Sequence, residues 1–316
     1  MIDFIFQKSE IGAGTRGSSL GPDAVRLASL KSGNSTFMNQ TVEVFPNENE
    51  VMYQPNDTPN AIRIKSMVQV WEKHAQGIQR SMDKSSFPFV FSADHASAGA
   101  TIAGIKMSTN ARMGVVWIDA HADLHSPYTS PSGNIHGMPL AASIADDNRE
   151  CARNAPSDET RDAWEKLKFT GGVSPKINPS DIVFVGVRDT EPEEEALMAR
   201  HNITNHTVDQ VRSKGMSAIL SNIEEQLSEC DLIYVSFDVD SMDPDMVSYG
   251  TGTPVPHGLS PDEASELING LLRLEKTRAF EIVEVNPLLD NKTNKMAETS
   301  LSIVDSALAE LKKRGV

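Results

Sequence analysis

Short, almost wholly apolar runs recur along the chain and alternate with longer stretches of amphipathic, helix-like pattern. Apolar runs that show no alternation with polar residues are typical of strands buried on both faces of a sheet. Strands are predicted over residues 87–92, 114–119, 181–187, 231–237 and 279–285. Strands that alternate with helices predict a mainly parallel central sheet with helices on both faces.

The stretches between these strands carry helical patterns. The pattern beginning at residue 260 opens with serine, proline and acidic residues, as helix starts do, and the last pattern ends in KKRG. The polar stretches 45–61 and 146–160 are expected to be long loops. We therefore expect one three-layer α/β/α domain over residues 1–316. Helices are predicted over 62–81, 97–109, 137–145, 158–168, 192–200, 215–229, 260–274 and 296–313.

Composition and charge narrow the classes of function. The formal net charge of −15 repels phosphate backbones and anionic lipids, which argues against nucleic-acid and membrane binding. The two cysteines, Cys151 and Cys230, are too few for a disulfide framework and are expected to be free thiols. The N-terminus lacks the basic start and long apolar core of a signal peptide. We expect a cytoplasmic protein.

Acidic and histidine residues directly follow four of the predicted strands. In open α/β sheets functional groups collect at the carboxyl ends of the strands. Two of the groups, in VWIDAHAD and SFDVD, place an acid or a histidine at every second position, so these side chains point the same way while the backbone stays extended. The residues concerned are His95, Asp119, His121, Asp123, Asp238, Asp240 and Glu284.

Six of these residues form a candidate set of metal ligands, because carboxylate and imidazole donors without cysteine suit Mn²⁺, Fe²⁺, Co²⁺ or Zn²⁺. Six ligands exceed the three that a single catalytic ion usually takes from the protein. They fit two ions roughly 3.5–4 Å apart, with some carboxylates bridging. A water held between such ions has a pKa lowered toward neutrality, which supplies a hydroxide near pH 7. The six are His95, Asp119, His121, Asp123, Asp238 and Asp240.

Four motifs resemble the signatures of the ureohydrolases, the arginase and agmatinase superfamily. They are DAHADLHSPYTSPSGNIHGMPLA (119–141), SFDVDSMDP (236–244), GTGTPVPHGLS (250–260) and EVNP (284–287). The resemblance implies a ureohydrolase-like α/β domain with two Mn²⁺ ions per subunit that hydrolyses a guanidino or formimino group, in a homo-trimer or homo-hexamer. It also implies that Asp119 and Asp238 bridge the ions, one held further by His95 and Asp123, the other by His121 and Asp240.

The same resemblance implies roles beside the metal. His136, in SGNIHG, would deliver a proton to the departing amine, as suits a histidine with an ordinary pKa near 6.5. Glu284 would anchor the planar guanidinium through paired hydrogen bonds. Together with the ligand Asp123, these two residues form the expected catalytic group.

The substrate is expected to meet the loop 124–134 with its outer end. Ser132 and Asn134 stand where arginases hold the α-carboxylate of arginine, which favours hydrolysis of L-arginine to L-ornithine and urea by a metal-bridging hydroxide. His125 stands where arginases typically have asparagine, and Glu191 stands where an aspartate is usual. These two residues, both expected to bind the substrate, keep formimidoylglutamate, other guanidino acids and amines such as agmatine open as alternatives.

A last departure from the family pattern lies at residues 92–96, where SADHA replaces the usual GGDHS. Glycine permits backbone angles that Ser92 and Ala93 resist, so we expect this turn to pack differently and to disturb the first metal site. A metal-binding relative without catalysis is therefore a further alternative. The complete ligand set and His136 argue against it.

Overall fold

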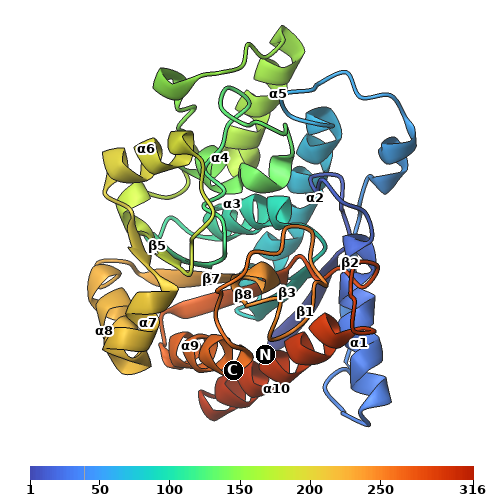
Figure 1. The fold of residues 1–316 in the computed structure, drawn as a ribbon, viewed down its shortest axis with the longest axis vertical. Helices are drawn as coiled ribbons and strands as arrows, with labels where there is room; N and C mark the ends of the chain where they lie inside the picture. The colour runs from blue at the N-terminus through green and yellow to red at the C-terminus, as the bar shows by residue number, and fades with distance from the viewer. Residues whose placement is uncertain (39) are drawn as a thin grey trace.

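A sheet of eight parallel strands forms the centre of the protein in a computed structural model that describes residues 1–38 and 40–316 (Figure 1). The strands lie in the order β2-β1-β3-β8-β7-β4-β5-β6, and every neighbouring pair is parallel. The strands are β1 (Ile2–Gln7), β2 (Val42–Phe45), β3 (Phe87–Ser92), β4 (Met113–Ile118), β5 (Ile182–Val185), β6 (Thr204–His206), β7 (Leu232–Asp238) and β8 (Thr277–Val283).

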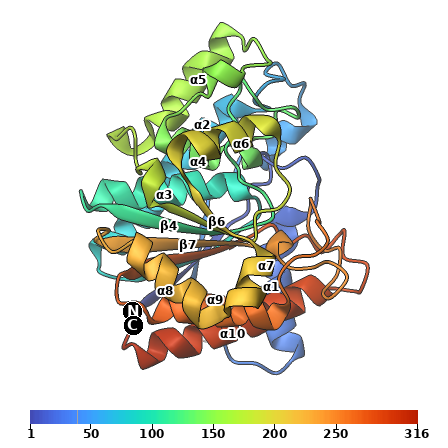
Figure 2. The same ribbon diagram turned by 60° about the vertical axis from the view of Figure 1, so that its left-hand side comes forward.

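Helices cover both faces of the sheet, which confirms the predicted three-layer α/β/α arrangement. Figure 2 shows α2 to α6 on one face and α1 and α7 to α10 on the other. The helices are α1 (Gly21–Lys31), α2 (Ile64–Asp83), α3 (Ala98–Ser108), α4 (Pro139–Ile144), α5 (Asp158–Lys168), α6 (Pro192–His201), α7 (Val208–Lys214), α8 (Met216–Gln226), α9 (Pro261–Arg273) and α10 (Lys295–Lys313).

Burial on both faces explains why the central strands are apolar almost throughout. Every residue of β3, β4, β5 and β7 is buried. On one face Phe237 and Phe280 pack in a cluster with α9 and α10, and on the other Trp117 and Tyr234 pack with α3 and α4. Packing on each face removes apolar surface from water, and this burial stabilises the fold by about 25 cal/mol per Å².

Five elements lie outside the predicted ones, namely β1, β2, β6, α1 and α7. Strand β2 (VEVF) is an edge strand with its two central residues exposed, so its sequence need not be apolar. Strand β6 (TNH) is three polar residues long at the opposite edge. Both strands depend on pairing with an inner strand, and the local hydrophobic pattern does not reveal such pairing. The predicted loop over 45–61 starts on the last residue of β2 and is otherwise irregular apart from a short 3-10 turn at Asn49–Tyr53.

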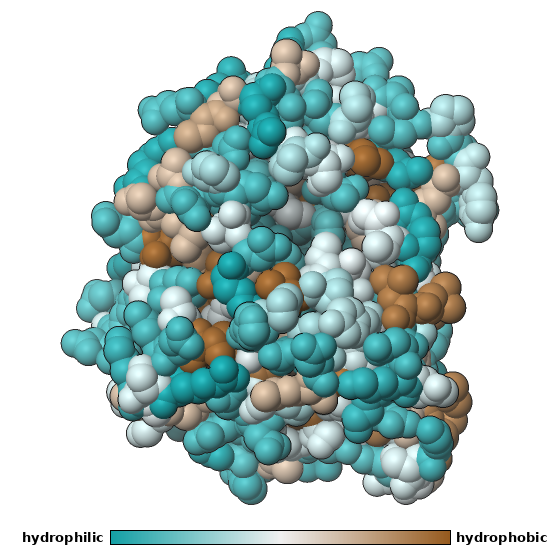
Figure 3. All heavy atoms as spheres, in the orientation of Figure 1, coloured by the Kyte–Doolittle hydropathy of each residue, from teal (hydrophilic) through white to brown (hydrophobic). Residues whose placement is uncertain are grey.

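A mainly hydrophilic surface is consistent with the net charge of −15. The face seen in Figure 3 is mainly hydrophilic, and its hydrophobic patches are small and separate. Among the described residues, none of the helices combines the length and hydrophobicity that crossing a bilayer requires.

Candidate metal centre

Four neighbouring strands, β3, β8, β7 and β4, end at one edge of the sheet and deliver the predicted residues there. His95 begins the short turn after β3, Asp119 follows β4, Asp238 is the last residue of β7, and Glu284 follows β8. The connections leaving β3 and β4 run over one face of the sheet, and those leaving β7 and β8 run over the other (Figure 2). Such divergence opens a crevice outside the strand ends, where α/β proteins place their sites.

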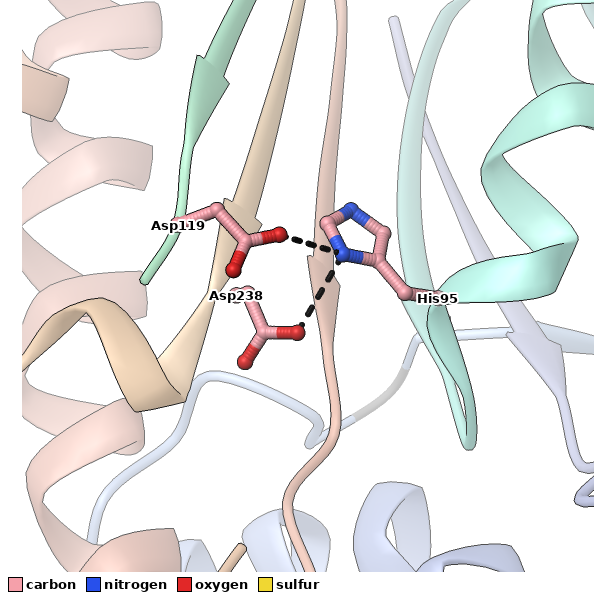
Figure 4. A group of neighbouring side chains, drawn as sticks. All are labelled: His95, Asp119 and Asp238. Carbon is pink, nitrogen blue, oxygen red and sulfur yellow. Dashed lines mark ion pairs between the residues drawn. The ribbon is translucent and has the colours of Figure 1, made fainter. Parts of the chain in front are cut away.

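His95 faces three carboxylates at the floor of this crevice. Its Nδ1 lies 2.9 Å from Asp119 Oδ2, 3.2 Å from Asp123 Oδ2 and 3.2 Å from Asp238 Oδ2. Figure 4 shows the imidazole ring with the carboxylates of Asp119 and Asp238 converging on this nitrogen. The four side chains are brought together as the sequence predicted.

A second donor group lies beside the first and shares Asp119 with it. His121 Nδ1 lies 3.1 Å from Asp240 Oδ2 and 3.4 Å from Asp119 Oδ1. The two oxygens of Asp119 therefore face different histidines, Oδ2 toward His95 and Oδ1 toward His121. This is the arrangement that a carboxylate bridging two cations requires.

The donor set fits divalent cations. Nδ1 of His95 is buried and has no hydrogen-bond partner among the described residues, although three carboxylate oxygens surround it. The other ring nitrogen, Nε2, lies 2.8 Å from Ser236 Oγ and is hydrogen-bonded there. Because Nε2 is engaged by the Ser236 hydroxyl, Nδ1 is the ring nitrogen that faces the carboxylates, and a shared cation would make that contact favourable.

The raised pKa values of the buried carboxylates are also consistent with a site for divalent cations. Burial, together with the charges of Asp240 and Asp119, holds the pKa of Asp238 well above its ordinary value. Burial and the charge of Asp119 likewise raise the pKa of Asp123 to about 6. Buried carboxylates this close together repel one another, and a divalent cation between them removes the repulsion.

Residues behind the ligands hold them in position. Trp117 Nε1 donates a hydrogen bond of 2.9 Å to Asp119 Oδ2, and Thr253 Oγ1 donates one of 3.0 Å to Asp240 Oδ2. The sequence analysis placed Trp117 only within a predicted buried strand and gave Thr253 no role. A signal for Trp117 was available, because it stands two residues before Asp119 and two-residue spacing puts both on one side of the strand.

Arg188 is a third residue that the sequence analysis missed. Its guanidinium donates to the backbone carbonyls of Gly186, Asp240, Ser241, Val255 and Pro256, at distances between 2.6 and 3.3 Å. It thereby ties the loops after β5 and β7 to the loop that precedes α9. One planar group with five donors makes these contacts at once, which a lysine cannot do.

His136 and Glu284 form a pair beside the ligands. His136 Nδ1 lies 3.2 Å from Glu284 Oε1, and the same oxygen accepts a 3.0 Å hydrogen bond from the backbone N–H of His95. Burial opposes the charged imidazole, but the Glu284 carboxylate outweighs it and raises the pKa of His136 to about 9. Glu284 has a φ of 66°, and Asp123 has a φ of 52°, an uncommon left-handed backbone for residues of their size.

A cavity of about 270 Å³ opens above the ligands. The buried Glu284 lies behind His136 and is not among the described residues of the cavity wall, so its expected contact with a guanidinium stays a prediction. Ser132 and Asn134 lie on the wall, where the sequence placed them. The wall comprises His95, His121, Asp123, His125, Ser130, Pro131, Ser132, Asn134, His136, Gly137, Asp189, Glu191, Glu194, Asp238, Asp240 and Thr253.

Two of the expected substrate-binding residues contact each other at the outer end of the cavity. His125 Nε2 lies 3.0 Å from Glu191 Oε2 and 3.6 Å from Glu194 Oε2. The side chain of Glu191 is 45% exposed, whereas those of His125 and Glu194 are buried. Glu194, in the first turn of α6, also accepts hydrogen bonds from the backbone N–H groups of Leu124 and Glu191.

The SADHA turn does not disturb the site, contrary to the expectation from its sequence. Neither Ser92 nor Ala93 has a positive φ, so glycine is not needed there. The Ser92 hydroxyl donates to the buried Glu281, which also accepts a 2.6 Å hydrogen bond from the Tyr234 hydroxyl. Ser92 thus provides a partner for a buried carboxylate, and His95 still reaches its three acids.

Comparisons with known proteins agree with this geometry. The family model described as "Arginase family" matches residues 6–309. The arginase of Bacillus subtilis is 33% identical over 312 residues, covering 98% of each chain, and its crystal structure superposes with a TM-score of 0.79 at 32% identity, again covering 98% of both.

Two further solved structures extend the comparison. The arginase of Entamoeba histolytica, solved in complex with L-ornithine, has a TM-score of 0.82 at 27% identity and covers 97% of this chain and 98% of its own. The formimidoylglutamase of B. subtilis has a TM-score of 0.73, covers 98% of this chain and 86% of its own, and at 19% identity shares the fold alone. On the family match and the identity to the B. subtilis enzyme, the chain belongs to the arginase family.

Proposed function

We propose that the protein hydrolyses the guanidino group of L-arginine to give L-ornithine and urea, with two Mn²⁺ ions per chain. The observation that carries the proposal is the pair of donor groups that share Asp119 at the floor of one cavity. Membership of the arginase family supports the reaction class.

The contacts support the ligand assignment that the family resemblance implies, except that the contacts place Asp238 beside His95 alone and its share in the second ion rests on the resemblance. His95, Asp119, Asp123 and Asp238 would hold one ion, and Asp119, His121, Asp238 and Asp240 would hold the other. Carboxylate and imidazole ligands suit manganese. When bound, such a pair of ions supplies a water of lowered pKa as the nucleophile at neutral pH.

His136 would move the proton that the departing amine needs. Its Nδ1 is engaged by Glu284, which leaves Nε2 as the ring nitrogen that can donate toward the cavity. The pKa near 9 keeps the imidazole protonated at neutral pH, and the Glu284 carboxylate holds its charge and its orientation. Such general-acid help is typically worth 10²–10⁴-fold in rate.

Residues at the outer end of the cavity would bind the α-carboxylate and α-ammonium groups of the substrate. Ser132 and Asn134 offer a hydroxyl and an amide to an α-carboxylate, and Glu191 and Glu194 offer acceptors to an α-ammonium group. The E. histolytica arginase binds L-ornithine, the product expected here, and this supports an amino-acid substrate.

One observation favours a second substrate class. The ion pair between His125 and Glu191 occupies two groups that would otherwise contact the α-carboxylate and α-ammonium of arginine. A substrate with a different outer end, such as formimidoylglutamate, another guanidino acid or agmatine, would need those groups less. The chemistry at the metal end would stay the same.

A substrate panel tests both proposals. The protein, loaded with Mn²⁺, is assayed for urea from arginine, agmatine and shorter guanidino acids, and for formamide from formimidoylglutamate. Urea from arginine with the largest kcat/KM supports the first proposal. Formamide from formimidoylglutamate without urea from arginine would replace it with the second. A chain that binds both ions and turns over none of these substrates would support a role in binding alone.

Location in the cytoplasm remains a proposal that follows from the N-terminal sequence and the two cysteines, and assembly into trimers or hexamers remains one that follows from the family resemblance. Light scattering coupled to gel filtration gives the mass of the assembly.

A further inference from the structure

A segment between α4 and α5 connects the two walls at the outer end of the cavity, which are the loop 124–134 and the start of α6. The segment comprises residues 146–154, within a stretch that the sequence predicted as a long loop, and we call it the bridging segment. None of its residues is among the described residues of the cavity wall. We propose that Asn148 in this segment is a positioning residue for substrate specificity, because it fixes how the two walls lie relative to each other. This inference rests on the proposed function, which places the α-carboxylate and α-ammonium groups of the substrate between these walls.

The bridging segment holds the loop 124–134 through main-chain contacts. The carbonyl of Tyr128 accepts hydrogen bonds from the backbone N–H groups of Arg153 and Asn154, both at 2.9 Å. The side-chain amide of Asn154 also donates to the carbonyl of Ser130, at 2.7 Å. Contacts to the main chain fix the course of the loop, and the course of the loop decides where its wall side chains point.

Asn148 holds the other wall, because its side chain contacts both ends of α6. Its Nδ2 donates to the carbonyl of Glu193, in the first turn, at 2.7 Å. Its Oδ1 accepts from Arg200 Nη2, in the last turn, at 2.9 Å. A guanidinium can only donate and a carbonyl can only accept, so this orientation of the amide is the one that satisfies both partners.

The surroundings of Asn148 keep this amide in place. Asp146 accepts from the backbone N–H of Asn148 at 2.8 Å through Oδ1, and its Oδ2 lies 2.8 Å from His201 Nε2 at the end of α6. Asn148 is 1% exposed and has a φ of 49°, a left-handed backbone that asparagine adopts more readily than most residues. Burial limits the access of water, so loss of the amide would weaken the link between the bridging segment and α6.

A shift of α6 would move both of its substrate-binding acceptors. Glu191 is the N-cap of this helix and Glu194 lies in its first turn, on either side of the carbonyl that Asn148 holds. A displacement on the order of 1 Å is enough to spoil a hydrogen bond to a bound ammonium group. The candidate metal ligands follow β3, β4 and β7, so the effect of such a shift should appear in substrate affinity and not in metal content.

Two variants of Asn148 test the proposal in the full-length protein loaded with Mn²⁺. Asn148→Gly keeps the left-handed backbone and removes the amide, whereas Asn148→Asp keeps the acceptor for Arg200 and loses the donor to Glu193. We expect both variants to raise KM for arginine and Kd for L-ornithine at least about fivefold, which corresponds to roughly one hydrogen bond. The kcat and the metal per chain should stay unchanged. Steady-state kinetics, titration calorimetry and plasma mass spectrometry measure these four quantities.

Asn202→Gly is the matched control. Asn202 also has a left-handed backbone, with a φ of 53°, and it ends the same helix, but it is exposed to solvent. This variant should keep the KM and the Kd of the wild type. It therefore separates the loss of the buried amide from a general effect of glycine beside α6.

The outcomes separate this inference from the proposed function. Wild-type KM and Kd in both Asn148 variants would overturn the positioning role. A loss of kcat or of metal as large as the loss of affinity would also overturn it, because a general weakening of the fold would affect the metal centre too. If the substrate panel identifies another substrate in place of arginine, the same KM comparison is made with that substrate, so rejection of arginine does not decide the role of Asn148.

Discussion

The imidazole of His95 lies flat against the indole of Trp117, with ring centroids 3.9 Å apart and planes 6° apart. The indole N–H donates to Asp119 Oδ2, so one side chain orients two ligands. We predict that Trp117→Phe, which keeps a stacking ring and loses the N–H, weakens Mn²⁺ binding about 10- to 100-fold, as loss of an outer hydrogen bond to a ligand usually does. Equilibrium dialysis measures this affinity. Binding equal to wild type would show that the indole serves only to fill the core.

Removal of Asp119 should affect both donor groups at once, because each of its oxygens faces a different histidine. We predict that Asp119→Ala loses metal and activity together, with a fall in kcat of at least about 10²-fold. Asp238→Ala should behave in the same way if it bridges too. Metal analysis beside the urea assay checks both variants, and an unchanged manganese stoichiometry would refute the bridging role.

His136 should matter for the rate and not for the metal. We predict that His136→Ala keeps two Mn²⁺ ions and loses about 10²–10⁴-fold in kcat. Loss of metal in this variant would instead make His136 a ligand.

The Glu284 carboxylate should set the pH range in which His136 is active. It raises the pKa of His136, so the protonated form is present at neutral pH and is lost as pH rises through the raised value near 9. In Glu284→Gln that pKa should fall toward about 6.5, and the alkaline fall in kcat should move to lower pH. A pH–rate profile with the same alkaline limb in both proteins would contradict this role.

The ion pair of His125 and Glu191 should weaken the binding of arginine. In His125→Asn an amide replaces the imidazole and Glu191 is released for an ammonium group. We predict a KM for arginine lower by roughly fivefold, the worth of about one hydrogen bond. Steady-state kinetics checks this, and an unchanged KM would remove residue 125 from the substrate site.

The buried His74 should make the fold sensitive to acid. Burial lowers its pKa from 6.5 to about 3, so the folded protein holds it neutral while the unfolded chain takes up a proton below about pH 6.5. Stability is therefore lost as pH falls from about 6.5 toward 3, by roughly 3 kcal/mol at about pH 4.5. Urea unfolding of wild type and His74→Gln at about pH 7.5 and 4.5 should show this difference in pH dependence. A gap between the two proteins that does not change with pH would exclude it.

The sequence predicted the inner strands, and it predicted that the six candidate metal ligands gather at one sheet edge, because both follow from local pattern. A strand such as 87–92 is apolar since it is buried on both faces, and Asp119 to Asp123 repeat with the strand period. The edge strands β2 and β6 carry no such pattern, because a neighbouring strand and not their own burial stabilises them.

The contacts around the candidate ligands could not be predicted from the sequence for a different reason. Arg188 binds carbonyls of residues up to 68 positions away, and Ser92 binds Glu281, 189 positions away. Nothing in the neighbouring sequence marks such partners. The position of Glu284 behind His136 likewise depends on how the turn after β8 packs, which its motif does not reveal.

The strand order carries a consequence for how the protein matures. Strand β8 is the last to be synthesised, yet it lies between β3 and β7 and sets the spacing between His95 and Asp238. A growing chain that has not yet added β8 contains all six candidate ligands but cannot hold them at their final separations. Formation of the candidate metal centre must therefore wait until this last strand inserts, which makes the site depend on nearly the whole chain.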